Sequence, residues 1–347
     1  MSKISKIKFI NITERKLKMK TFGFRHLILF LPIIFGITIF NSSCSDSTID
    51  PGVQTDDDFI RSIAISNSYS SNADDDDNLF HNEEEDFESS GAVYNNENSV
   101  NSPLDSIERW GRRITGKNVN VNITNYGDTL KSADLTKTIS GNFIIIGYLG
   151  GNLDSTVKPF TQESRRTISF KRVNRRPNPR LNWRVYQYSA IDGESKTPQT
   201  GKENIVMNRV EYFRNNNLVL TLNGPDFTSN IFTSRFFSNN SFIDLGRGDQ
   251  IKIKVYLTSN QNDTDIVAYH WAKNSFGFHR EPFVMTSQIQ NGNNFDRTYE
   301  KTFEVYNQHR HGIHNGYISS NTRSSLYDNT TSLFSSTYMG LPYRVRQ

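Results

Sequence analysis

The order of apolar and polar residues along the second half of the chain predicts β-strands. Residues 119–124 alternate strictly between β-branched residues and Asn or Thr, as a half-buried strand does. Residues 142–149 are almost continuously apolar, which predicts a strand buried on both faces. Similar runs recur between segments rich in Gly, Asn, Pro and Asp. The other predicted strands are 167–173, 181–190, 205–213, 218–222, 251–258, 266–271, 282–290 and 299–306.

This spacing of short strands favours an all-β fold with two immunoglobulin-like β-sandwich domains. We expect the first sandwich at 104–203 and the second at 204–306, because 198–203 has the composition of a linker. The tail 307–347 ends in a predicted edge strand at 340–345. Ser102-Pro103 predicts a short helix that Gly111 ends. No internal repeat shows that the two halves are duplicates.

The amino-terminal region has the pattern of a secretion signal. Residues 27–40 are an apolar run of fourteen residues interrupted only by Pro, Gly and Thr, which is too short to span a bilayer. Lys20 and Arg25 precede the run, so residues 1–43 are predicted to be a signal peptide. Counted from Met19 the leader has an ordinary length, and we expect Met19 to be the true start.

The residues that follow the apolar run carry a family resemblance. Asn41-Ser42-Ser43 stands directly before Cys44, the only Cys of the chain. This arrangement resembles the lipobox of bacterial lipoproteins, with Asn41 where that family prefers Leu. The resemblance implies that Cys44 carries the lipid and becomes the mature amino terminus, so the membrane is the expected partner there.

The composition after Cys44 carries a second resemblance. The run that follows it is rich in Asn, Ser and Asp and is similar to surface lipoproteins of Bacteroidota-like bacteria. This similarity implies a lipid-anchored protein of the outer membrane in the bacterial cell envelope, with exposure at the cell surface as one arrangement.

The net charge of +4 combines three different regions. Residues 1–43 have a net charge of +7, residues 44–109 of −15, and residues 110–347 of +12. Because low hydrophobicity and like charges disfavour ordering, residues 44–103 are predicted to be a disordered acidic tether. The basic body does not predict a nucleic-acid partner, since the chain is expected to be exported.

Composition and motifs exclude several classes of protein. A single Cys excludes a disulfide scaffold, and a mean hydropathy of −0.61 excludes a polytopic membrane protein. The chain has no Gly-x-Ser-x-Gly and no His-Glu-x-x-His motif. We therefore expect no enzyme and no cofactor, but a non-catalytic binding or structural module.

The alternative is a secreted carbohydrate-active enzyme or a carbohydrate-binding protein. Glycoside hydrolysis needs two carboxylates across a cleft, whereas the eighteen acids of residues 110–347 are scattered. Trp183, Tyr186, Tyr188 and Tyr212 are candidates for an aromatic platform that binds sugars, and core packing explains them equally well.

Histidines near residue 310 are weak candidates for a metal site. His309, His311 and His314 have a spacing that could contribute ligands to zinc. Asn and Gly residues around them also fit a solvated turn, and no neighbouring acid would orient an imidazole ring. No metal site is therefore predicted.

The strongest local charge feature is a cluster of eight cations, which is a candidate anion-binding site. Three explanations stay open: simple solubility, an external anionic glycan or protein partner, and the acidic tether folded back on the body. The eight residues are Arg165, Arg166, Lys171, Arg172, Arg175, Arg176, Arg180 and Arg184.

Overall fold

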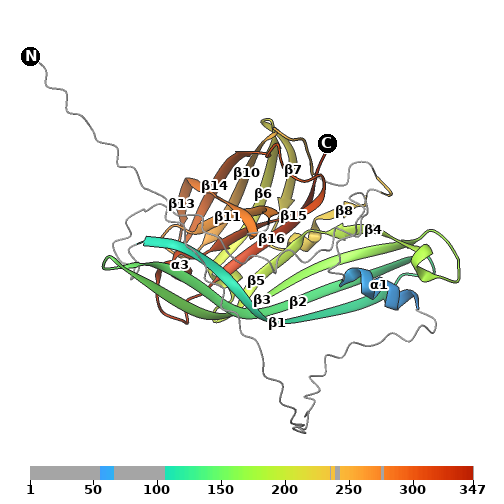
Figure 1. The fold of residues 1–347 in the computed structure, drawn as a ribbon, viewed down its shortest axis with the longest axis horizontal. Coiled ribbons are helices and arrows are strands. Elements are labelled where there is room, and N and C mark those ends of the chain that lie inside the picture. Colours follow the sequence, from blue (N-terminus) through green and yellow to red (C-terminus); the bar gives the residue numbers. More distant parts are fainter. Residues whose placement is uncertain (1–54, 66–105, 235, 239–242, 275–276, 347) are drawn as a thin grey trace, which may run out of the picture. The chain divides into compact units, whose positions relative to one another are not determined.

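The computed structural model describes residues 55–65, 106–234, 236–238, 243–274 and 277–346, all within the unit Pro51–Gln347. Strands dominate this part of the chain and form two sheets (Figure 1), which confirms the predicted all-β, sandwich-like fold. The immunoglobulin-like subtype stays a prediction. The signal peptide, Cys44 and most of the acidic tether lie outside the described residues.

The larger sheet has eleven strands and contains the longest strands of the fold. Its main order is β1-β2-β3-β5-β16-β15-β11-β12, with β4 and β8 beside β3 and with β9 beside β16. Every pairing in it is antiparallel except that of β9 with β16. The strands are β1 (Ser106–Asn125), β2 (Leu130–Leu149), β3 (Asn152–Arg172), β4 (Trp183–Ser189), β5 (Ile191–Thr197), β8 (Ile231–Thr233), β9 (Ile243–Leu245), β11 (Ile266–Asn274), β12 (Gly277–Pro282), β15 (Gly312–Asn321) and β16 (Ser336–Val345).

The smaller sheet has five strands in the order β13-β14-β10-β6-β7. Asn215 and Asn216 join β6 to β7 with φ angles of 49° and 66°. Positive φ at both central residues is what a two-residue type I′ hairpin requires, and Asn tolerates it. The strands are β6 (Ile205–Arg214), β7 (Asn217–Asn223), β10 (Gln250–Ser259), β13 (Val284–Asn291) and β14 (Asn294–Glu304).

The main hydrophobic core lies between the smaller sheet and β11, β15 and β16 of the larger one. From the smaller sheet, alternate residues such as Ile251, Ile253 and Val255 are buried. From the larger sheet, Trp271 and Met339 are fully buried in the same cluster. Burial of alternate strand residues from two facing sheets is the packing of a β-sandwich.

The first three strands are much longer than the sequence pattern predicts. β1 begins at Ser106, so the predicted helix that Gly111 ends is wrong. Register shifts after Ile107 and after Ile114 put an extra residue into β1 at two places. Each bulge reverses the alternation of faces, which hides the strand pattern in the sequence. Residues 142–149 alternate between buried and more exposed positions, so they are not buried on both faces as predicted.

The predicted boundary between residues 203 and 204 does not separate two sandwiches. β5 pairs with β16, so strands from before and after that boundary belong to one sheet. The predicted edge strand at 340–345 is part of β16, which lies between β5 and β15. β15, also in the predicted tail, is mostly buried. The carboxy-terminal residues therefore complete the core.

A helix forms within the segment that was predicted to be disordered. In α1 (Asp56–Ala64), Thr55 and Asp58 form a reciprocal capping box, which stabilises the first turn. Phe59, Ile60 and Ala64 are buried against β1–β4, so the prediction of disorder is wrong for residues 55–65. The other helices are short: η3 (Pro179–Leu181), α2 (Gly201–Asn204), η4 (Phe227–Ser229) and α3 (Arg323–Tyr327).

Candidate functional site

One face of the β1–β3 sheet carries a regular series of cations. The antiparallel registers of β1 with β2 and of β2 with β3 place one residue of each strand side by side in transverse rows. Alternate rows point to the same face. We call the face that carries Trp110, Phe143 and Phe160 the inner face, and these three side chains are buried on it. Eight rows of this face run from the row of Trp110 to the row of Asn125.

Five of these eight rows contain a Lys or an Arg, and none contains a carboxylate. We call these five the cation rows. Asp134 and Glu163 alternate onto the opposite face of the same strands. Successive rows of one face are roughly 6.6 Å apart along a strand. The cations are Arg112 and Lys158 in one row, and Lys117, Lys137, Arg166 and Lys131 in one row each.

Several of these cations are buried and held in place by polar contacts. Arg112, Lys137 and Arg166 are each less than 9% exposed. Arg112 donates to the side chain of Gln162, and its guanidinium lies 5.9 Å from the centre of the Phe160 ring. Arg166 donates to the backbone oxygen of Ser189. These guanidinium groups are therefore oriented by acceptors within the protein and are largely shielded from solvent.

Lys158 connects the inner face to the segment that joins β15 to β16. Its Nζ donates to the backbone oxygens of Ser324 at 3.0 Å and Leu333 at 2.7 Å. Burial lowers the pKa of Lys158 from 10.5 to about 8, against a smaller opposing effect of Asp328. The joining segment also contributes Leu326, Tyr327 and Phe334 to a hydrophobic cluster with β1, β2 and β3.

A small pocket lies at the Trp110 end of this face. It has about 20 Å³ for the centre of a water molecule, which is room for about one water. Its walls combine aromatic rings with amide, hydroxyl and cationic groups from β1, β2, β3, β11, β15 and β16. The lining residues are Trp110, Arg112, Phe143, Gln162, His270, Ser319, Asn321, Phe334, Ser336 and Tyr338.

Two side chains of this pocket show how positive its surroundings are. The Arg280 guanidinium lies 3.6 Å from the centre of the Trp110 ring, a close cation–π contact. Burial first, and the charges of Arg280 and Arg112 second, hold the pKa of His270 well below its usual 6.5. His270 Nε2 is 2.8 Å from the hydroxyl of Ser319. His270 is therefore neutral near pH 7 and serves as a hydrogen-bonding group.

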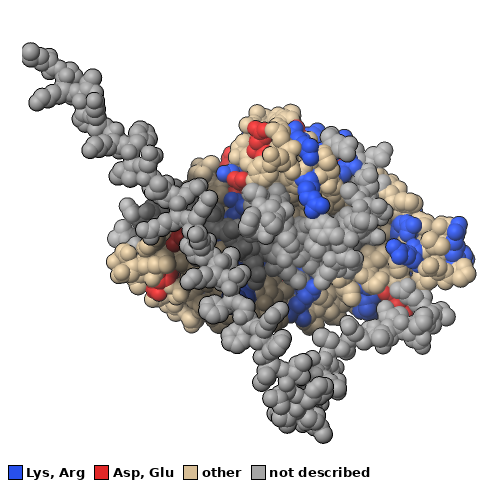
Figure 2. Space-filling view, viewed as in Figure 1, with Lys and Arg blue, Asp and Glu red and all other residues tan. Residues whose placement is uncertain are grey.

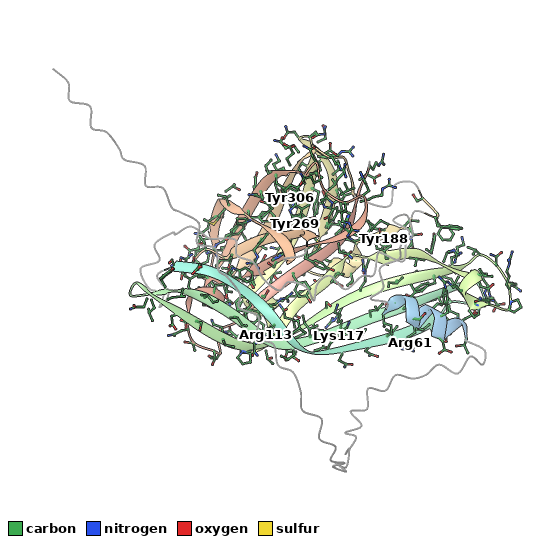
Figure 3. The ribbon with its side chains drawn as sticks, in the orientation of Figure 1. Arg61, Arg113, Lys117, Tyr188, Tyr269 and Tyr306 are labelled. Atoms are coloured by element: carbon green, nitrogen blue, oxygen red, sulfur yellow. The ribbon has the colours of Figure 1, made fainter. Side chains whose placement is uncertain are left out.

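The acidic helix α1 lies at the other end of the inner face. Asp56 forms an ion pair with Arg172, the next inner-face residue of β3 beyond the rows, and Asp57 forms one with Lys131. Both cations also lie over the Trp183 ring, at 4.8 and 5.4 Å from its centre. Arg61 of α1 donates to the backbone oxygen of Val121 at 2.8 Å. Figure 3 shows Arg113 and Lys117 along β1, with Arg61 of α1 further along the same strand.

The structure divides the eight predicted cations instead of gathering them at one site. Arg166 and Arg172 belong to the inner face, whereas Arg165 lies on the opposite face and pairs with Glu163 at 2.9 Å. Lys171 lies 5.3 Å from the centre of the Tyr186 ring. Arg175, Arg176 and Arg180 are exposed in the connection between β3 and β4, and Arg184 lies in β4. Figure 2 shows Lys and Arg gathered at this end of β3 and β4. A role of all eight in binding anions stays a prediction.

Of the three weak metal candidates, His309 and His314 are held by hydrogen bonds, whereas the buried Nδ1 of His311 has no hydrogen-bond partner among the described residues. His309 is buried, with its Nε2 3.0 Å from the Tyr343 hydroxyl and its Nδ1 2.9 Å from the Arg310 backbone oxygen. His314 Nε2 is 2.9 Å from the same oxygen. Burial and the neighbouring His309 lower the pKa of His314 to about 4. Among the described residues, no group of three or more His, Cys, Asp or Glu side chains could hold a metal ion.

The predicted aromatic platform consists mostly of core residues. Trp183, Tyr188 and Tyr212 are at most 3% exposed. Trp183 and Tyr188 belong to the cluster that receives α1, while Tyr212 belongs to the sandwich core. Tyr186 is partly exposed. Core packing therefore explains three of these four residues.

The alternative of a carbohydrate-active enzyme requires two carboxylates, and two of them are neighbours in β5. Asp192 and Glu194 lie two residues apart in β5. Lys202 Nζ is 2.5 Å from Asp192, and Lys196 Nζ is 2.6 Å from Glu194. Both carboxylates are thus engaged in ion pairs.

Comparison with known proteins gives no family for this chain. No protein-family model and no curated protein matches it. One solved structure that matches is a GH31 alpha-xylosidase from Xanthomonas citri, with 6% identity and a TM-score of 0.21. The match covers 65% of this chain and 32% of the xylosidase chain. At this TM-score the similarity carries no argument about fold or function. Separately, the described residues contain no helix that is long and apolar enough to cross a membrane.

Sequence reasoning missed most of the inner-face cations. Within β2 the inner-face cations Lys131 and Lys137 both have odd residue numbers, and within β3 Lys158 and Arg166 both have even ones. This parity is the signal that could have found them. In β1 the bulge after Ile114 places Arg112 and Lys117 on one face although their numbers differ in parity.

Proposed function

We propose that the protein is a non-catalytic binding module of the bacterial cell envelope that binds an acidic polysaccharide on its inner face. The observation that carries this proposal is the series of five cation rows without a carboxylate. Lys and Arg side chains at regular intervals suit a ligand whose negative charges also repeat.

The expected export of the chain favours a glycan over a nucleic acid as the external polyanion. Gln162, Asn321 and Ser336 are buried around a pocket with room for about one water, so a sugar chain would lie along the rows and outside that pocket. There the cations would bind its carboxylate or sulfate groups.

The absence of a catalytic role is part of the proposal. A general acid–base mechanism needs a group that exchanges a proton near neutral pH at the reacting bond. The rows from Trp110 to Asn125 contain only Lys and Arg as ionisable groups. Among them Lys158 has a pKa lowered to about 8, but it is fully buried and its Nζ donates to two backbone oxygens. Beside them, His270 has a pKa well below that range.

The proposed localisation rests on the sequence alone. The apolar run 27–40 and the lipobox-like residues before Cys44 support lipidation at Cys44 and anchoring in the outer membrane. Stable anchoring takes more than one acyl chain, and the lipid of bacterial lipoproteins would meet this need.

The binding proposal is tested by removing two inner-face charges. Lys117→Gln/Lys137→Gln should weaken binding to polygalacturonate about thirtyfold at low salt, because two charge-assisted contacts of about 1 kcal/mol each sum to about 2 kcal/mol. The control is Lys252→Gln/Lys301→Gln in the smaller sheet, which removes the same charge. Calorimetric titration measures both, with polyglutamate and neutral dextran as comparison ligands. Equal affinities of the two double variants would contradict the proposal, and a preference for polyglutamate would indicate an acidic protein partner instead.

A further inference from the structure

The small pocket at the Trp110 end of the inner face lies where the two ends of the larger sheet meet. β1 and β12 are the first and last strands in the main order of that sheet. The guanidinium of Arg280 in β12 donates to the backbone oxygen of Trp110 in β1 at 3.3 and 3.4 Å. Six strands of this one sheet supply most of the pocket wall. The pocket is therefore enclosed by a sheet that curls until its terminal strands touch.

A polar atom of the pocket wall lacks a hydrogen-bond partner. Trp110 is 6% exposed, and its indole Nε1 has no acceptor among the described residues. Buried donors in folded proteins are almost always paired with a protein group, a water or an ion. Trp183 and Trp271 share the unpaired indole nitrogen, but neither of them lines this pocket. Trp110 has a space beside its ring in which an acceptor can sit.

The charges around the pocket favour an anion over a water as that acceptor. Arg112 lies in the wall and is 7% exposed, and its guanidinium has five N–H donors, one of which bonds to Gln162. None of the lining residues is an Asp or a Glu. Burial first, and then the charges of Arg280 and Arg112, hold the pKa of His270 well below its usual range. The same positive charges attract a negative ion into the space between them.

The size of the pocket restricts this anion to a single atom. The space of about 20 Å³ for the centre of a water molecule is room for about one water. Sulfate, phosphate and carboxylate groups consist of several atoms and do not fit into it. A chloride ion is only slightly larger than a water molecule. The pocket thus differs from the cation rows, which lie open to larger anionic groups.

We propose that this pocket is a structural chloride site, in which the indole N–H of Trp110 and the guanidinium of Arg112 donate to one chloride ion. The site goes beyond the proposed function and does not depend on it. The ion would offset buried positive charge, which is costly without a partner. Since both donors belong to β1, beside its contact with β12, chloride would also stabilise the closure of the larger sheet.

Thermal unfolding of the full chain at constant ionic strength tests the site. Chloride is exchanged for gluconate, which has too many atoms for the pocket. A ligand that binds only the folded chain stabilises it, so the wild-type Tm should rise by about 3 °C once chloride exceeds its dissociation constant tenfold. A wild-type Tm that is the same in chloride and in gluconate would overturn the proposal.

Two matched variants assign this rise to the pocket. Trp110→Phe keeps an aromatic ring beside Arg280 and removes the indole N–H, so most of the chloride-dependent rise should be lost. Trp183→Phe also removes a buried indole N–H without a partner, but away from the pocket, and should keep the full rise whatever its own stability. Equal rises in the two variants would place the effect elsewhere and overturn the site.

Wild-type crystals soaked in sodium bromide locate the ion without any substitution, so this measurement does not depend on how the variants fold. Bromide replaces chloride and scatters anomalously near its absorption edge. An anomalous peak in the pocket, in contact with Trp110 Nε1 and the Arg112 guanidinium, is the expected result. Density at that position without an anomalous signal would identify a water molecule, and it would overturn the chloride site even if chloride raised the Tm.

Discussion

In β10, the alternate residues Ile251, Ile253 and Val255 are buried among apolar side chains between the two sheets. In β3 the same alternation buries Lys158, Gln162 and Arg166 on the inner face. Burying apolar surface is favourable by about 25 cal/mol per Å², whereas burying a charge is costly unless partners compensate it. The sandwich core thus explains why the chain folds, and the inner face carries charges that stability alone does not call for.

The largest expected effect concerns the ion pair of Arg297 and Asp265, whose two side chains, alone among the ion pairs of the described residues, have no exposed surface. Arg297 also donates to Gln288 and to three backbone oxygens of the loop 261–263. Arg297→Met would leave these acceptors and the carboxylate without their donor, and breaking such a pair costs about 3–5 kcal/mol. Urea denaturation measures the loss.

The comparison for that experiment is the partly exposed pair of Lys254 and Glu300 in the same sheet. Lys254→Met should cost less than about 1 kcal/mol, since exposed pairs contribute little. A similar loss for both variants would mean that the buried pair has no special role in the smaller sheet.

The next largest effect is a pH dependence of the free energy of unfolding, which we expect from Lys158 on the inner face. The pKa of Lys158 is about 8 in the folded protein and 10.5 in its ordinary state. Between these values the unfolded chain binds more protons, so stability should rise with pH, by at most about 3 kcal/mol. Because Tyr residues ionise near pH 10, the clean window is pH 8 to 9.5.

Lys158→Met should remove this rise while it preserves the apolar stem of the side chain. The measurement is the free energy of urea unfolding of both proteins at pH 8 and pH 9.5. Parallel changes in the two proteins would show that Lys158 does not titrate in this window.

The sequence pattern predicted the smaller sheet better than the inner face. Strands at 205–213, 218–222 and 251–258 match β6, β7 and β10 within one residue at each end, because each is a short run between turn residues. β15 was missed because its sequence includes Asn, Gly and Ser at buried positions and the partly buried His314. Odd or even numbering within β2 and β3 could indicate which cations share a face. Their alignment into rows depends on the register between strands and on the bulge after Ile114 in β1, which no local pattern displays. The alternation of residues within one strand does not show which strands pair with each other, or in which register.

The smallest effect on stability is expected for the exposed connection between β3 and β4. Arg175 and Arg176 are exposed there, and Arg172 is left unchanged because it pairs with Asp56. Arg175→Gln/Arg176→Gln should change the free energy of unfolding by less than about 0.5 kcal/mol, as surface substitutions usually do. The variant should elute earlier than wild type from a phosphate-bearing column at low salt, and the difference should vanish at high salt because exposed charges are screened. In the polygalacturonate titration, Arg175→Gln/Arg176→Gln should lower the affinity much less than Lys117→Gln/Lys137→Gln does. If instead the loop variant loses more affinity than the inner-face variant, the anion-binding surface is the exposed loop and not the cation rows.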